Sequence, residues 1–74
     1  MLEKRSISVS GHRTSIALES EFWNVLALIA ARQETTLGAL IAAVDNTRTQ
    51  DASLASALRV HALTAAIENA RQQA

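Results

Sequence analysis

The sequence predicts a small, mostly α-helical domain with one N-terminal strand, two core helices and a C-terminal third helix. The chain has 74 residues, 49% of them hydrophobic, and it has neither proline nor cysteine. Disorder, a loop-rich scaffold and a disulfide or thiolate framework are therefore not expected. One early segment has the two-residue period of a strand, and three later segments have the spacing of amphipathic helices. Fifteen alanines bury little area each, so we expect a homodimer to complete the core.

The first residues are predicted to be a flexible basic arm, residues 1–10, that carries Lys4 and Arg5. Gly11 is expected to mark the start of the ordered strand. Beyond it, two sets of side chains alternate as in a strand, with Thr14, Ile16 and Leu18 facing a core and Arg13, Ser15 and Ala17 facing outward. A single strand leaves its N–H and C=O groups without partners. We therefore expect two copies to pair their strands antiparallel across a twofold axis.

Three helices follow the strand. The acids around Ser20 suit the start of a helix that runs to about Gln33, and Thr36 is a good N-cap for a second helix that ends near Asn46. Ser53 caps a third, which runs to Gln72. We expect residues 11–47 to form the core unit and residues 53–72 to complete the dimer. The residues expected in the dimer core are Ile16, Leu18, Phe22, Trp23, Leu26, Ile29, Leu40, Ile41 and Val44.

Several classes of function are not expected. His61 lies on an apolar helical face without a second histidine or carboxylate one turn away, and no nucleophile–base pair is evident. We therefore expect no catalysis, no metal and no cofactor. The longest apolar run, Val25 to Ala31, is far shorter than a membrane span, so we expect a soluble, cytoplasmic protein. The formal net charge is +0, which gives no overall argument for nucleic acid.

Three motifs in order resemble those of one family. Residues 11–19 read G-H-R-T-S-I-A-L-E, residues 22–23 read F-W, and residues 56–60 read S-A-L-R-V. With Leu40 and Ile41 of the second helix, this pattern resembles the small bacterial ribbon-helix-helix proteins of the Arc and MetJ superfamily. The resemblance covers about residues 4–63, nearly the whole chain. It implies an intertwined dimer whose two-stranded ribbon enters the DNA major groove.

The resemblance assigns roles to particular residues. Arg13, Ser15 and Ala17 would contact base edges, which suits a guanidinium on guanine and a hydroxyl on most bases. The start of the second helix at Thr36, Leu37 and Gly38 would hold a backbone phosphate. From charge alone, Lys4 and Arg5 are further candidates for phosphate contacts. The implied function is a homodimeric, sequence-specific transcriptional regulator of the repressor type that binds double-stranded DNA.

A second interpretation is a protein-interaction module. The neutral charge, Ala17 and the acid-bearing turn at residues 34–36 favour it over DNA binding. In this alternative the same dimer, like a small antitoxin, uses residues 53–72 to bind a partner protein.

Overall fold

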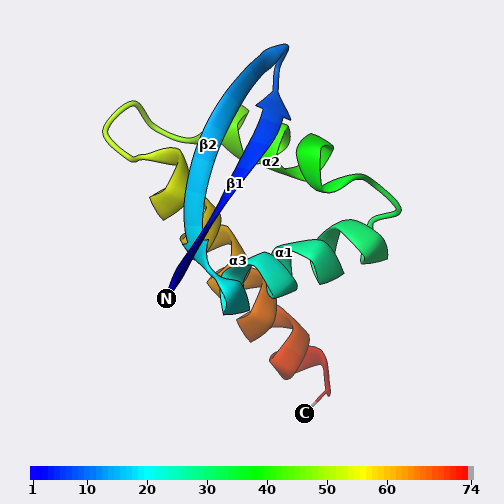
Figure 1. Cartoon of the computed structure of the whole chain (residues 1–74). Helices are drawn as coiled ribbons and strands as arrows, with labels where there is room; N and C mark the ends of the chain where they lie inside the picture. The colour runs from blue at the N-terminus through cyan, green and yellow to red at the C-terminus, as the bar shows by residue number, and fades with distance from the viewer. Residues whose placement is uncertain (74) are drawn as a thin grey trace.

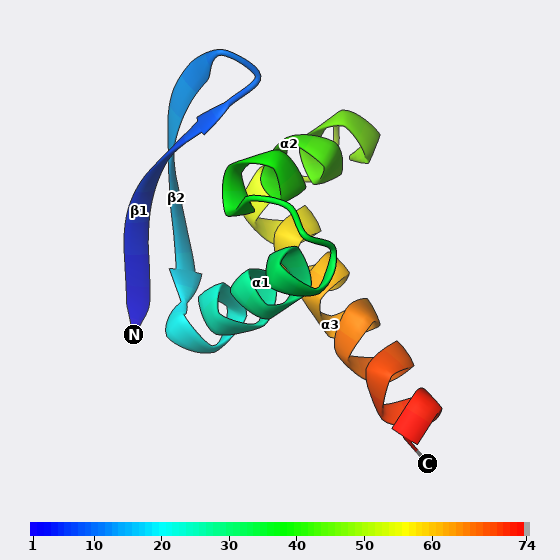
Figure 2. The same cartoon turned by 90° about the vertical axis from the view of Figure 1, so that its right-hand side faces the viewer.

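The computed structural model describes residues 1–73 and places a β-hairpin against three helices (Figure 1). In chain order the elements are β1 (Leu2–Val9), β2 (His12–Glu19), α1 (Ser20–Arg32), α2 (Leu37–Thr47) and α3 (Leu54–Gln73). The hairpin lies on one side of the helices, and the C-terminal half of α3 extends away from it (Figure 2). The predicted strand and the three predicted helices are present, and β1 is an additional element.

A two-residue turn at Ser10 and Gly11 joins the strands. Both residues have positive φ, 53° and 84°, which is the combination of a type I′ hairpin turn. Glycine adopts this conformation without steric cost, and a Cβ on Gly11 would meet no atom within 4 Å. Gly11 therefore closes a hairpin, and it directly precedes β2, the strand whose start it was expected to mark.

The partner of β2 is β1 of the same chain. The two strands pair antiparallel from Leu2 opposite Glu19 to Val9 opposite His12. Residues 1–10 thus contain a strand where we expected a flexible arm, and β2 has a partner without a strand from a second copy. The physical reason is the turn, because a tight I′ connection brings the following strand back beside the preceding one. The alternation of hydrophobic residues with serines in β1 was the sequence signal for this strand.

The inner face of the hairpin and the three helices share one hydrophobic core. Its buried members are Val9, Ile16, Leu18, Trp23, Leu26, Ala30, Leu40, Ile41, Val44, Leu58 and Ala62. The indole Nε1 of Trp23 donates a hydrogen bond to the backbone oxygen of Glu3 at 2.8 Å. This bond satisfies the only polar atom of a buried indole and ties β1 to α1.

The ends of α1 are capped in two different ways. At its start no side chain caps the helix, so the cap expected around Ser20 is not formed. At its end the N–H of Glu34 donates to the oxygen of Ala31 and that of Thr35 to the oxygen of Ala30. These are the two bonds of a Schellman motif, which requires a left-handed residue, and Glu34 takes that place with a φ of 54°.

The other two helix starts agree with the sequence. Thr36 is the N-cap of α2, where its Oγ1 accepts a hydrogen bond from the N–H of Ala39 at 3.0 Å. Ser53 precedes α3, and its Oγ accepts a hydrogen bond from the N–H of Ser56 at 3.1 Å. Both caps satisfy amide groups that have no acceptor within their own helix.

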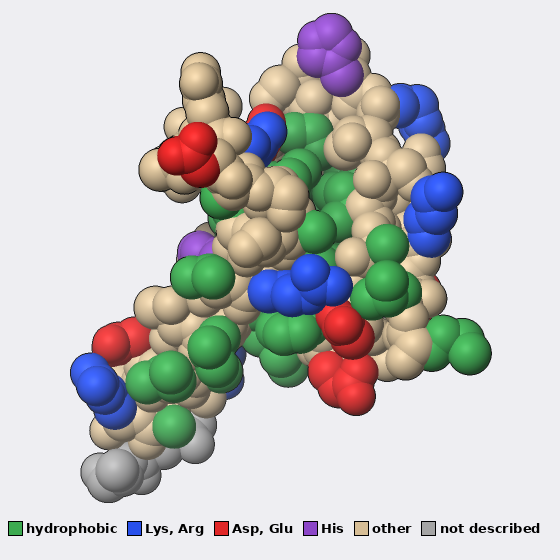
Figure 3. All heavy atoms as spheres, turned by 90° about the vertical axis from the view of Figure 1, so that its left-hand side faces the viewer, with side chains coloured by type: hydrophobic (Ala, Val, Ile, Leu, Met, Phe, Trp, Pro, Cys, Tyr) green, Lys and Arg blue, Asp and Glu red, His purple; other side chains and the backbone are tan. Residues whose placement is uncertain are grey.

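Helix α3 is apolar on two opposite faces. Leu58 and Ala62 are buried against the other helices, whereas Val60, Leu63 and Ile67 are 60%, 58% and 46% exposed. The three exposed residues follow the i, i+3, i+7 spacing of one helical face, which we call the α3 stripe. Figure 3 shows hydrophobic side chains gathered on the exposed surface of this helix.

Within residues 1–73 no single helix is long and apolar enough to cross a membrane. Helices α1 and α2 are long and apolar enough only when taken together, and they are bent by 101° relative to each other.

Candidate nucleic-acid interface

One face of the hairpin points away from the helices. In an antiparallel pair, directly opposite residues share a face, so the register defines this outer face. Its members are Lys4, Ser6 and Ser8 of β1 and Arg13, Ser15 and Ala17 of β2. All of them are exposed except Ala17, which is half-buried. The three β2 residues therefore lie on the outward face that the sequence alternation predicted for them.

The outer face carries two cations that have no acidic partner among residues 1–73. Lys4 and Arg13 make no ion pair there, whereas Arg5, Arg48, Arg59 and Arg71 each pair with a carboxylate. Arg32 donates to the amide oxygen of Asn69 at 2.7 Å. Blue side chains stand along the edge of the hairpin that faces away from the helices in Figure 3. The positive charge that remains available to an anionic ligand is therefore concentrated on one face.

The two cations stand at different ends of the ribbon. Arg13 lies opposite Ser8 near the turn, and Lys4 lies opposite Ala17. Arg13 and Ala17 are four residues apart, which corresponds to roughly 13 Å along a strand. Small polar side chains occupy the positions between them, so the surface between the two charges is rich in hydroxyl groups.

Arg5 does not join this surface. The register places it opposite Ile16, on the inner face. Its Nε donates to Oε2 of Glu3 at 2.6 Å, and its guanidinium lies 4.7 Å from the centroid of the Trp23 ring. Lys4 and Arg5, both expected to contact phosphate, therefore lie on opposite faces of the ribbon, because consecutive strand residues point to opposite faces.

The start of α2 lies beside the ribbon. A Cβ placed on Gly38 would be 3.6 Å from the backbone oxygen of Ser8, so the first turn of α2 adjoins β1 near the level of Arg13. Thr36 and Leu37 precede Gly38 in the same turn, where amide groups point along the helix axis without intrahelical acceptors. The structure thus brings the predicted helix terminus and the predicted strand residue to the same end of the hairpin.

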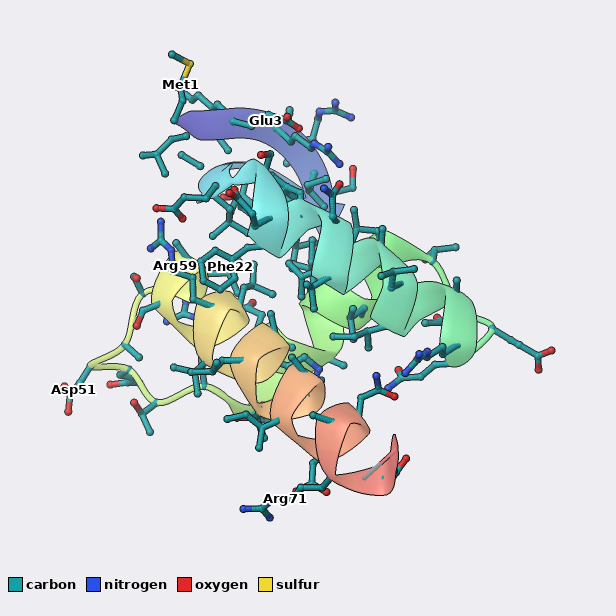
Figure 4. All side chains as sticks on the ribbon, turned by 90° about the horizontal axis from the view of Figure 1, so that it is seen from below. Met1, Glu3, Phe22, Asp51, Arg59 and Arg71 are labelled. Atoms are coloured by element: carbon teal, nitrogen blue, oxygen red, sulfur yellow. The ribbon has the colours of Figure 1, made fainter. Side chains whose placement is uncertain are left out.

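The base of the ribbon is held by α3. Arg59 donates from Nε to Oε1 of Glu19 at 3.0 Å, and its guanidinium carbon lies 5.8 Å from the centroid of the Phe22 ring (Figure 4). The pKa of Glu19 is lowered from its ordinary value of 4.5, first by a backbone hydrogen bond and then by the hydrogen bond from Arg59. Arg59 lies in the third motif, but no sequence pattern pointed to this contact with Glu19.

The fold agrees with a known family. The ribbon-helix-helix domain profile matches residues 2–66, which include the hairpin, α1, α2 and most of α3. The chain belongs to the ribbon-helix-helix family. A search of curated proteins found no match.

A solved structure similar to this chain comes from Bordetella pertussis Tohama I. It is an uncharacterized protein with 32% sequence identity and a TM-score of 0.83. The match covers 100% of this chain and 62% of the Bordetella chain. This chain therefore spans less than two thirds of the length of that neighbour. The likeness includes the hairpin as well as the three helices.

The residues expected in a dimer core are placed inside this single ribbon-helix-helix domain. Seven of the nine are buried by the chain's own hairpin and helices, and Phe22 and Ile29 are half-buried. Their burial here needs no second copy, because β1 and α3 supply the covering surface. Phe22 and Ile29 are packed against the same core.

Two further residues of the outer face were missed at the sequence level. Ser6 and Ser8 lie directly opposite Ser15 and Arg13, and both are exposed. Their signal was the alternation with the inward hydrophobic residues of β1.

Within residues 1–73, no three His, Cys, Asp or Glu side chains form a group that could hold a metal ion. The Nε2 atom of His61 is buried and has no hydrogen-bond partner in this part of the chain.

Proposed function

We propose that this protein binds double-stranded DNA sequence-specifically through the outer face of its ribbon and regulates transcription as a repressor. Ribbon-helix-helix domains are in general DNA-binding regulators. The observation that carries the proposal is that Lys4 and Arg13, which make neither an ion pair nor a side-chain hydrogen bond in residues 1–73, share this face. A two-stranded ribbon fits the major groove, which is about 12 Å wide. The helices all lie behind the ribbon and leave this face open (Figure 2).

Each β2 side chain on the outer face has a chemical role in this proposal. The guanidinium of Arg13 donates in a fork to O6 and N7 of guanine. The hydroxyl of Ser15 both donates and accepts, so it pairs with most base edges. Ala17 offers a methyl group to the methyl of thymine. Together they supply one charged, one polar and one apolar contact along the groove.

Phosphate contacts flank these base contacts. Lys4, at the base of the ribbon, supplies a point charge for one phosphate. The amides of Leu37 and Gly38, with the hydroxyl of Thr36, offer hydrogen bonds and the positive end of the α2 dipole to another. Because Gly38 adjoins Ser8, this second contact would lie at the same end as Arg13. Such contacts fix the orientation of the ribbon without choosing a sequence.

The protein acts as a homodimer in the bacterial cytoplasm in this proposal. The α3 stripe supports the dimer, because three exposed apolar residues on one helical face are self-complementary across a twofold axis. A separate groove of about 340 Å³ between α1 and α3, with exposed Leu28 among its lining residues, lies on the other face of α3. Two such domains would place two ribbons on a repeated or palindromic operator.

The test is fluorescence anisotropy with the full chain. Binding is measured on random-sequence duplex across a salt series, and on a duplex that the wild type selects from a random library. Arg13→Ala should weaken binding to a selected duplex by about 1–3 kcal/mol, as for a bidentate base contact. Arg71→Ala is the matched control, because Arg71 is exposed at the far end of α3 and pairs with Glu68 at 3.6 Å. The control should bind as tightly as the wild type.

The salt series decides whether the surface binds DNA at all. Several phosphate contacts release several counterions, so affinity should fall steeply with salt. Absence of duplex binding at low salt, with the fold intact by circular dichroism, would refute the proposal. Repression is then tested with a reporter that carries the selected duplex in its promoter.

The α3 stripe also favours a second candidate function, binding of another protein through residues 53–72. Val60, Leu63 and Ile67 form the apolar stripe that helix-in-groove recognition uses. In this case a partner co-purifies with the wild type and is lost with Leu63→Glu, while duplex binding is absent. A stripe variant that changes only the dimer would exclude this candidate.

A further inference from the structure

We propose that β1 supplies half of the base-reading surface, with Ser6 and Ser8 contacting base edges beside Ser15 and Arg13. This inference rests on the proposed function, since it takes the outer face as the surface that enters the groove. Both strands of this hairpin come from one chain, so β1 and β2 present their outward side chains on one face.

The register places the serines where such contacts are possible. Ser6 lies directly opposite Ser15, and Ser8 lies directly opposite Arg13. Directly opposite Cβ atoms in an antiparallel pair are about 4.5–5.5 Å apart. Any base edge within reach of Ser15 is therefore also close to Ser6. The same holds for Arg13 and Ser8.

The hydroxyls of these serines are available. Ser6 and Ser8 are exposed, and within residues 1–73 neither hydroxyl is hydrogen-bonded to another residue. A serine hydroxyl donates one hydrogen bond and accepts others, so it can match either an acceptor or a donor on a base. Its small size also lets the backbone of β1 approach the floor of the groove closely.

Strand β1 is held in place before any ligand binds. The indole of Trp23 donates to the backbone oxygen of Glu3 at 2.8 Å, and Arg5 covers the ring of the same indole at 4.7 Å. These contacts lie on the inner face, one strand position away from the outward side chains. They give Arg5 a positioning role, because they order β1 as one strand of the ribbon. Ordering in advance reduces the entropic cost of binding.

The dimensions also fit. Lys4 and Ser8 are four residues apart, which is about 13 Å along the strand and about four base-pair steps of duplex. The outer face of one chain would therefore read a site of about four base pairs, with contacts from both strands.

The experiment begins with selection of a preferred duplex from a random library by the full-length wild type. Ser6→Ala and Ser8→Ala are then compared with Ser56→Ala, an exposed serine on α3 away from the ribbon. Each β1 variant should bind the selected duplex about threefold to tenfold more weakly, as for one lost hydrogen bond. Its affinity for random duplex should not change, and neither should the slope of log affinity against log salt concentration, because no phosphate contact is removed. Ser56→Ala should match the wild type.

A repeated selection with each β1 variant gives a second readout that loss of folding would not imitate. The variant's sequence preference should relax at one base pair of the site and persist at the others. If both serine variants bind the selected duplex within about twofold of wild type while Arg13→Ala does not, the inference is wrong and the proposed function stands. If neither the wild type nor any variant binds duplex, the proposed function fails as well.

Discussion

Arg59 of α3 donates a hydrogen bond from Nε to Oε1 of Glu19 at 3.0 Å, at the residue where β2 passes into α1. The two residues belong to the last and the first of the three sequence motifs, 40 positions apart. The guanidinium also approaches the ring of Phe22. Helix α3 is thereby tied to the base of the ribbon as well as to the other helices.

This contact predicts a specific acid sensitivity. The pKa of Glu19 is lowered in the folded protein, so its stabilising effect is complete above its ordinary value of 4.5. The effect is lost as the pH falls through the lowered pKa. Glu19→Gln should therefore flatten the decline of the urea midpoint from about pH 5 to about pH 3. Arg59→Met should flatten the decline less, because the backbone hydrogen bond, which lowers the pKa of Glu19 most, remains. Profiles of Glu19→Gln that superimpose on the wild type would contradict this.

Trp23→Phe should destabilise the protein by about 1–3 kcal/mol, because the part-buried hydrogen bond to the backbone oxygen of Glu3 is lost and the buried indole is replaced by a smaller ring. Urea unfolding followed by circular dichroism measures the effect, since Trp23 is the only tryptophan in the chain. Leu28→Ala is the control, because Leu28 is 62% exposed and should change stability little. An equal, small effect of both variants would show that the bond contributes nothing.

Glu34→Gly should stabilise the protein by roughly 0.5–1 kcal/mol, because glycine adopts a φ of 54° without the cost that a Cβ imposes. Thermal unfolding measures the change. Glu34→Ala removes the same carboxylate but keeps the Cβ, so it separates charge from backbone strain. If alanine stabilises as much as glycine, the gain is electrostatic and the backbone explanation is wrong.

Gly11→Ala should cost roughly 1 kcal/mol, because alanine at a φ of 84° is strained although the space around it is open. The matched variant is Gly38→Ala, where the added Cβ would lie 3.6 Å from the oxygen of Ser8, an ordinary contact inside a helix. Gly38→Ala should therefore be neutral or stabilising. Chemical denaturation measures the free energy of unfolding of both variants. A loss for Gly11→Ala but not for Gly38→Ala would show that the turn requires glycine and the helix does not.

Leu63→Glu should weaken the proposed dimer about tenfold or more without unfolding the chain, because it places a charge in the α3 stripe. Sedimentation velocity across a concentration series measures the association. Ala43→Glu adds the same charge at an exposed position of α2 and should leave association unchanged. A wild type that remains monomeric at every concentration would contradict the dimer.

The sequence alone determined the local structure of this protein. The side-chain oxygens of Thr36 and Ser53 set the starts of two helices, because such caps act within one turn. The alternation in β2 set which side Arg13 faces, because the strand period is two residues. These are short-range effects that neighbouring residues decide among themselves.

The tertiary structure decided which strands and side chains of the chain contact one another. Strand β2 could satisfy its backbone in a second copy or in β1, and the I′ turn at Ser10 and Gly11 selected β1. Arg5 and Lys4 are neighbours in sequence, yet packing against Trp23 engaged only Arg5 and left Lys4 on the outer face. Such choices depend on contacts between residues far apart in the chain, whose energies cannot be read from a local pattern. They determined which charged side chains lie on the outer face.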